Sequence, residues 1–146
     1  MLKRYTFWLK AAVVFQFLSG AIHSVSLFLT PTADDPTEGQ MLNLIMTYKM
    51  DMGAGFHPTF FNLFIALSSC FTFICFFAAL TNGYLLSKHT APKVMRGIIA
   101  INLLIFGALL AVVAYFTFLL PITCMGLIFV SLLAAFIAVP KIESAL

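Results

Sequence analysis

Long hydrophobic runs separated by short polar segments dominate the chain. Four mainly apolar runs cover about residues 7–30, 59–80, 94–116 and 119–139. Each is close to the roughly 20 residues that a helix needs to cross the hydrocarbon core of a bilayer. Prolines lie at or near the ends of these runs, where a missing backbone N–H costs least: Pro31, Pro58, Pro92, Pro121 and Pro140. The pattern predicts four transmembrane helices.

Composition places these helices in lipid rather than in a soluble core. The chain has 146 residues, of which 62% are hydrophobic and 9% are charged. A soluble domain carries about a quarter charged residues, and a domain of this size has too little interior to bury so much apolar surface. We therefore expect an all-α fold, an integral membrane four-helix bundle that forms a single domain over residues 1–146.

The basic residues predict how the chain is threaded. Seven of the eight Lys and Arg residues precede or open the first run, separate the second from the third, or follow the fourth: Lys3, Arg4, Lys10, Lys88, Lys93, Arg96 and Lys141. Basic segments stay in the cytoplasm, so both termini are expected there and residues 31–57 outside. The net charge of +3 reflects this rim, and we expect no nucleic-acid partner.

The segment between the first two runs has a pattern of its own. The stretch TEGQMLNLIMTYKM, residues 37–50, reads as a short amphipathic helix that Thr37 or Asp35 could cap. MGAG, residues 52–55, is expected to end it. Such a helix lies at the outer interface or folds over the mouth of the bundle.

Stripes of small and polar residues predict which helix faces turn inward, because helices in lipid pack through such residues. Asn62 and Asn102 are expected to hydrogen-bond other helices, and Gly83 to cap the second run in NGY, residues 82–84. The expected inward stripes are Gln16, Ser19, Gly20, His23 and Ser26; Asn62, Ala66, Ser69 and Phe73; Gly97, Ala100, Leu104, Gly107, Ala111 and Ala114; and Ala134, Ala135 and Ala138.

His23 is the residue that most invites a chemical interpretation. It lies roughly 10 Å below the outer end of the first run, and ionisable residues within a membrane are functional suspects. His57, Glu38, Asp51 and Asn62 belong to the same outer third, and imidazole with carboxylate can bind zinc or relay protons. Against this, the spacings match no metal motif and the acids are typical of solvated loops, so structural packing is the favoured interpretation.

The first part of the chain resembles a family of small, uncharacterised bacterial four-helix inner-membrane proteins. The resemblance rests on GAIHSVSLF, on the loop sequence QMLNLIMTYKMDMGAGFH with Glu38 before it, and on LTNGYLL; it covers roughly residues 1 to 90. The last two runs match in hydropathy alone. The resemblance implies a bacterial inner membrane and brings no activity.

Two hypotheses about function follow. Because hydrolytic and nucleotide-binding motifs are missing from the sequence, we expect an integral membrane protein that acts as an accessory or interaction subunit, with no cofactor. Its partners would be membrane lipids and either another protein or further copies of itself. The alternative is a binding protein or an enzyme that holds a small ligand, a lipid or a metal in an outer-facing polar cavity near His23. A lipid-facing side unusually rich in small residues, with no internal cavity, would favour the first hypothesis. A polar cavity under the loop helix would favour the second.

Overall fold

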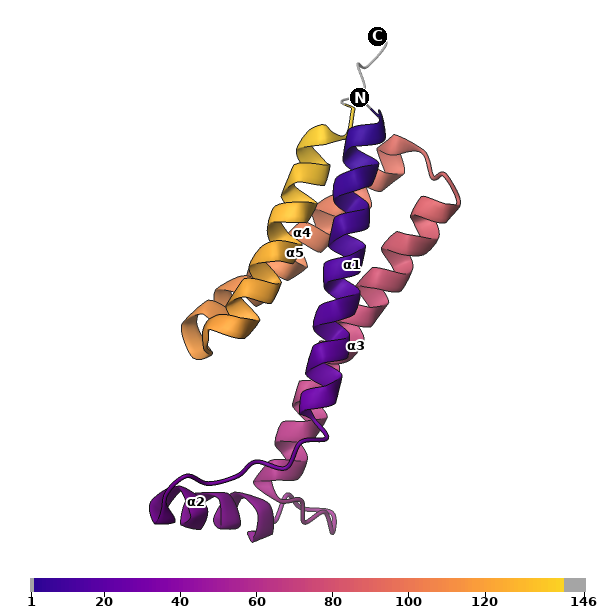
Figure 1. Ribbon diagram of the computed structural model, residues 1–146. Helices are drawn as coiled ribbons and strands as arrows, with labels where there is room; N and C mark the ends of the chain where they lie inside the picture. The colour runs from indigo at the N-terminus through magenta and orange to yellow at the C-terminus, as the bar shows by residue number, and fades with distance from the viewer. Residues whose placement is uncertain (1, 141–146) are drawn as a thin grey trace. The chain divides into compact units, whose positions relative to one another are not determined.

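The computed structural model describes residues 2–140, and side chains from Tyr5 onward. These residues form five α-helices: α1 (Leu2–Ser26), α2 (Pro36–Thr47), α3 (Phe60–Ser87), α4 (Pro92–Phe116) and α5 (Leu119–Ala138) (Figure 1). The predicted all-helical fold is confirmed, and the described part of the chain has no strand beyond one bridge between Lys49 and Thr59. All helices except α2 are long and apolar enough to cross a membrane, as expected of a multi-pass membrane protein.

The chain divides into two compact units. The first, which we call the four-helix unit, comprises Met1–Ser19 and Cys75–Leu146 and so contains α4, α5, most of α1 and the end of α3. The second, which we call the loop unit, is Gly20–Ile74 and contains α2 with the remaining parts of α1 and α3. The single domain expected from the sequence stays a prediction, which the continuity of α1 and α3 favours. Lys141 lies outside the described residues.

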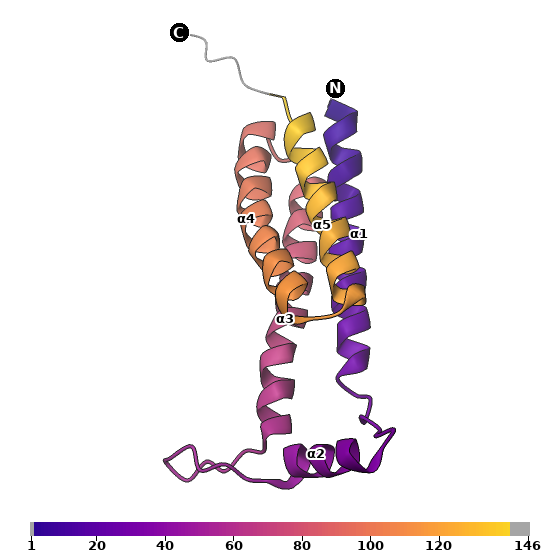
Figure 2. The same ribbon diagram turned by 90° about the vertical axis from the view of Figure 1, so that its left-hand side faces the viewer.

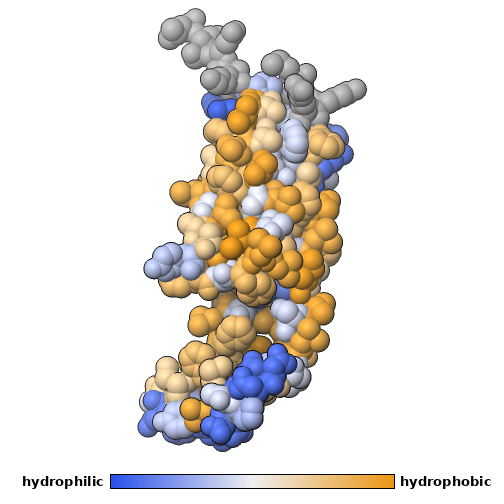
Figure 3. All heavy atoms as spheres, turned by 60° about the vertical axis from the view of Figure 1, so that its left-hand side comes forward, coloured by the Kyte–Doolittle hydropathy of each residue, from blue (hydrophilic) through white to orange (hydrophobic). Residues whose placement is uncertain are grey.

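Large apolar side chains form the core of the four-helix unit. Met95, Ile99 and Phe106 are buried on one face of α4, and Leu132 of α5 and Leu9 of α1 are also fully buried. In this unit the start of α1, the α3–α4 connection and the end of α5 lie at one end (Figures 1 and 2). On the face that Figure 3 shows, hydrophobic residues cover most of the surface of the spanning helices, as lipid contact requires.

The stripe prediction is confirmed for the middle of α1 and wrong for its last residue and for α3. Gln16, Ser19 and Gly20 are buried as expected and His23 is half-buried, whereas Ser26 is exposed. On α3, Asn62, Ala66 and Phe73 are exposed. The side of α3 that turns inward is offset by about half a helical turn from the expected one. It consists of other small or polar residues: Thr72, Cys75, Ala78, Ala79 and Asn82.

The stripe prediction for α4 is also wrong for most of its residues. Gly97, Ala100 and Ala111 are exposed, and only Gly107 makes a close approach: a Cβ there would lie 3.1 Å from Cε2 of Phe129 on α5. The face of α4 that packs inward carries its large residues instead. Packing area therefore decided the orientation of α4, while small size alone did not.

Two helix ends differ from the expected ones. α1 ends at Ser26 rather than near Thr30, and α3 continues through Gly83, whose Cβ position lies 3.8 Å from Val13 Cγ1, to Ser87. The backbone N–H of Thr90 donates to the carbonyl of Leu85 at 3.2 Å. This is the Schellman pattern, in which the residue after the helix adopts the left-handed conformation. That residue is His89, with φ of 50°.

Candidate functional site

His23 contacts α3 through its side chain. Its Nε2 lies 3.2 Å from the carbonyl oxygen of Ser68, and its ring packs edge-on against Phe71 with centroids 4.9 Å apart. Because a carbonyl can only accept, Nε2 carries the proton in this contact. Both contacts are of the structural kind that the sequence favours for His23.

The same carbonyl is the ordinary partner of a second buried polar group. Thr72 follows Ser68 by one helical turn, and a threonine in a helix usually donates to the carbonyl four residues earlier. Its hydroxyl is buried without a partner among the described residues. The Ser68 carbonyl bonds the imidazole of His23 and not the hydroxyl of Thr72, so this bond joins α3 to α1.

His57 and Asp51 face each other across a hairpin that follows α2. The backbone N–H of Met50 donates to the carbonyl of Pro58 at 3.0 Å, which places residues 51 and 57 directly opposite. His57 Nδ1 lies 4.0 Å from Asp51 Oδ1, with both side chains more than half exposed. Asp51 also accepts the backbone N–H of Gly53 at 2.9 Å. An exposed pair of this kind contributes little to stability.

Glu38 and Asp35 hold the first turn of α2. Asp35 accepts the backbone N–H groups of Thr37 at 2.7 Å and Glu38 at 3.0 Å, so Asp35 and not Thr37 is the N-cap. Both bonds lower the pKa of Asp35 below its ordinary value, and the bond from the N–H of Glu38 has the largest effect. Glu38 reaches back and accepts the backbone N–H of Asp34 at 2.8 Å. Both carboxylates are therefore used in starting the helix.

Asn62 starts α3 in the same way. Its Oδ1 accepts the backbone N–H of Thr59 at 3.1 Å, and the hydroxyl of Thr59 accepts the backbone N–H of Asn62 at 3.2 Å. This reciprocal pair is a capping box, so the expectation of an interhelical bond is wrong for Asn62. Within residues 2–140, no three His, Cys, Asp or Glu side chains gather as a metal site would require. A site built from His23, His57, Glu38, Asp51 and Asn62 stays a prediction.

A cluster of three amides lies in the four-helix unit, one each from α1, α3 and α4. Asn82 donates to Gln16 Oε1 at 3.1 Å and to Asn102 Oδ1 at 3.2 Å, and Gln16 donates to Asn102 Oδ1 at 3.4 Å. Gln16 and Asn82 are fully buried. The expected role of Asn102 is thereby confirmed. Asn82 was missed because its glycine neighbour suggested a helix end, although Cys75, Ala78, Ala79 and Asn82 have the spacing of one helix face.

Arg96 is the other polar residue that joins helices in this unit. Its guanidinium donates to the carbonyls of Phe136 at 3.2 Å and Val139 at 3.4 Å, and lies 4.1 Å from the ring centroid of Phe136. These carbonyls belong to the end of α5, where helix geometry leaves them without partners and where positive charge is favourable. Arg96 therefore caps α5 from α4.

A cavity of about 290 Å³ lies where α1, the end of α3 and the start of α4 meet. Its lining includes Tyr5, Thr6, His89, Thr90, Pro92 and Met95. This cavity is in the four-helix unit, at the end that holds most of the basic residues, and no residue of α2 contributes to its lining. It is therefore not the polar cavity under the loop helix that the alternative hypothesis expected.

No protein-family model, curated protein or solved structure matches the chain, so the functional interpretation rests on these contacts.

Proposed function

We propose that this protein is an accessory subunit that binds a transmembrane helix of its partner through the outward face of α4. One observation supports this most strongly: the side of α4 opposite its buried residues carries several exposed small residues along its length. A Cβ added at Gly97 would meet nothing within 4 Å, and Ala100, Ala108, Ala111 and Ala114 are exposed. In a membrane, small residues allow the close helix contacts that hold helices together.

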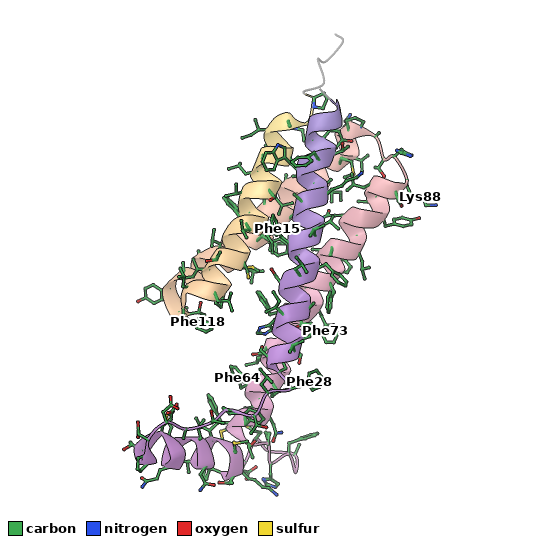
Figure 4. All side chains as sticks on the ribbon, in the orientation of Figure 1. Phe15, Phe28, Phe64, Phe73, Lys88 and Phe118 are labelled. Carbon is green, nitrogen blue, oxygen red and sulfur yellow. The ribbon has the colours of Figure 1, made fainter. Side chains whose placement is uncertain are left out.

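The other spanning helices turn large side chains outward. Phe73 is 68% exposed and Phe77 is 73% exposed on α3, and Ile137 is 73% exposed on α5; Figure 4 shows Phe73 extending away from α3. Such residues match lipid tails without giving another backbone close access. The outward face of α4 combines small residues with the large side chains of Leu104, Ile101 and Tyr115, which are 76%, 56% and 82% exposed. A second helix would approach over the small residues between them.

We place the protein in the bacterial inner membrane with both termini in the cytoplasm. The support is the position of Lys88, Lys93 and Arg96, which follow α3 or open α4, at the same end of the four-helix unit as the start of α1 and the end of α5 (Figures 1 and 2). Basic segments remain inside. A Thr32→Cys variant should then react with a membrane-impermeant maleimide from outside intact spheroplasts. Reaction only after lysis would contradict this orientation.

The test of the function uses substitutions on the outward face that leave the chain's own packing alone. Gly97→Leu with Ala111→Leu places two large side chains where the protein has open space or an exposed position. We expect the complex extracted from native membranes in mild detergent to fall to the size of the free subunit, while thermal stability in detergent stays unchanged. Native electrophoresis and light scattering measure the two sizes.

Ala66→Leu is the matched control, because Ala66 is an exposed small residue on α3. It should leave the complex intact, since the proposed contact does not include that helix face. If the double α4 variant keeps the wild-type size, or if Ala66→Leu dissociates the complex as well, the outward face of α4 is not the interaction surface.

A further inference from the structure

We propose that the cavity between α1 and the α3–α4 connection binds a phosphate group, such as that of an anionic lipid headgroup. This inference is independent of the proposed subunit function, because the cavity and the outward face of α4 share no lining residue. The volume of about 290 Å³ corresponds to about ten water molecules of liquid. That is enough room for a phosphate with its ester group.

Tyr5 supplies a donor without a partner in the wall of the cavity. The residue is only 6% exposed and lines the cavity, and its hydroxyl makes no hydrogen bond within the described part of the chain. The hydroxyl oxygen itself is not fully buried, so a molecule in the cavity can reach it. The phenol O–H therefore has a donor position open to whatever occupies the cavity, and a phosphate oxygen is a strong acceptor.

His89 lines the same cavity from a conformation that favours glycine. Its φ of 50° lies in the left-handed region, where a Cβ is unfavourable and where helix ends usually place glycine. The chain nevertheless has an imidazole at this position, next to Thr90, whose hydroxyl already donates to Leu85 O at 2.9 Å. An imidazole adds at least one N–H donor, and a positive charge when protonated.

The first turn of α4 adds backbone donors. The helix begins at Pro92, and its N-cap residue Ala91 forms no side-chain capping bond. The N–H groups of Lys93 and Val94 therefore have no partner from helix geometry or from a cap. Pro92 and Met95 from the same turn line the cavity. A helix start of this kind attracts anions through its N–H groups and its dipole.

Charge in the four-helix unit also favours an anion. Lys88 and Lys93 are exposed beside the cavity, and Lys88 Nζ lies 5.6 Å from the Tyr84 ring centroid at the end of α3 (Figure 4). The described residues of this unit contain no Asp or Glu at all. Among the described residues, no carboxylate of the unit can therefore neutralise the basic end, whereas the anionic lipids of the surrounding leaflet can.

The test compares lipid binding by delipidated protein in a neutral detergent, measured by native mass spectrometry. We expect one phosphatidylglycerol to bind more tightly than phosphatidylcholine. Tyr5→Phe and His89→Gly should each weaken that binding at least about tenfold, the loss expected from one hydrogen bond to a charged group. Because glycine adopts the left-handed conformation without strain, His89→Gly should keep or raise thermal stability, which separates binding from folding.

Tyr84→Phe is the control, since this tyrosine is exposed at the same helix end and does not line the cavity; it should bind like the wild type. A parallel titration with inorganic phosphate distinguishes a lipid headgroup from free phosphate as the ligand. If inorganic phosphate binds and Tyr5→Phe weakens its binding to the same extent, the site is supported with free phosphate as its ligand. Equal binding of the two lipids with no binding of phosphate, or wild-type affinity in both cavity variants, would overturn the proposal.

Discussion

Amide side chains on the same helix have different hydrogen-bond partners in the two units. In the four-helix unit, Gln16, Asn82 and Asn102 hydrogen-bond one another across three helices. In the loop unit, Asn62 bonds the start of its own helix and Ser69 donates to the carbonyl of Ile65 on its own helix at 2.8 Å. The amides of the four-helix unit thus bond between helices, whereas Asn62 and Ser69 of the loop unit bond their own helix. Hydroxyls bond their own helix in the four-helix unit as well, as Thr117 and Thr123 do.

The difference follows from the number of neighbours. An amide surrounded by several helices finds donors and acceptors on them, and every such bond fixes the position of one helix relative to another. A polar side chain with few neighbours in an apolar medium turns to its own backbone, because an unsatisfied group costs more there. His23 is the exception in the loop unit, and its bond to the Ser68 carbonyl joins α1 to α3.

Removing one amide from each unit should give the largest difference in the loss of unfolding free energy between the two units. Asn82→Leu leaves the Oε1 of Gln16 and the Oδ1 of Asn102 without their shared donor, and we expect a loss of about 2–3 kcal/mol. Asn62→Leu removes only a helix cap and should cost about 1 kcal/mol. Unfolding by SDS from mixed micelles, followed by circular dichroism, measures both free energies. Equal losses would break the comparison between the units.

A second pair of variants compares an inward with an outward glycine of α4. A Cβ at Gly107 would lie 3.1 Å from Phe129, whereas one at Gly97 would meet nothing. Gly107→Leu should therefore destabilise the four-helix unit by about 1–3 kcal/mol through overpacking. Gly97→Leu should leave the free energy of unfolding unchanged in detergent. A tolerated leucine at 107 would mean that α4 and α5 are packed less closely than described.

The smallest effect concerns the start of α2, which is held by local bonds. Backbone N–H donors lower the pKa of Asp35 below 3.8. A lowered folded-state pKa means that the cap stabilises α2 fully above pH 3.8 and that this contribution is lost as the pH falls through the lowered value. Amide exchange of residues 36–47 should therefore speed up on acidification. Asp35→Asn keeps a capping oxygen and should show a smaller change; an identical pH profile would exclude Asp35 as its source.

The spanning helices could be predicted from the sequence because length and hydropathy determine them. So could the buried side of α1, where Gln16, Ser19 and Gly20 form a stripe unlike the rest of the helix. On α3 and α4 several faces carry small residues, and only the packing of Phe106 and Ile99 in three dimensions decides between them. The cavity that His89 lines could not be predicted, because the residues around it lie far apart in the sequence.

Hydrogen–deuterium exchange along α3 in detergent tests the central comparison most directly, because this one helix runs through both units. Its residues 75–87 belong to the four-helix unit and contain Asn82, while residues 60–74 belong to the loop unit. Cross-helix bonds and a packed core oppose local opening, so we predict markedly slower exchange in residues 75–82 than in residues 64–71. Equal rates in the two segments, or faster exchange in residues 75–82, would contradict the account.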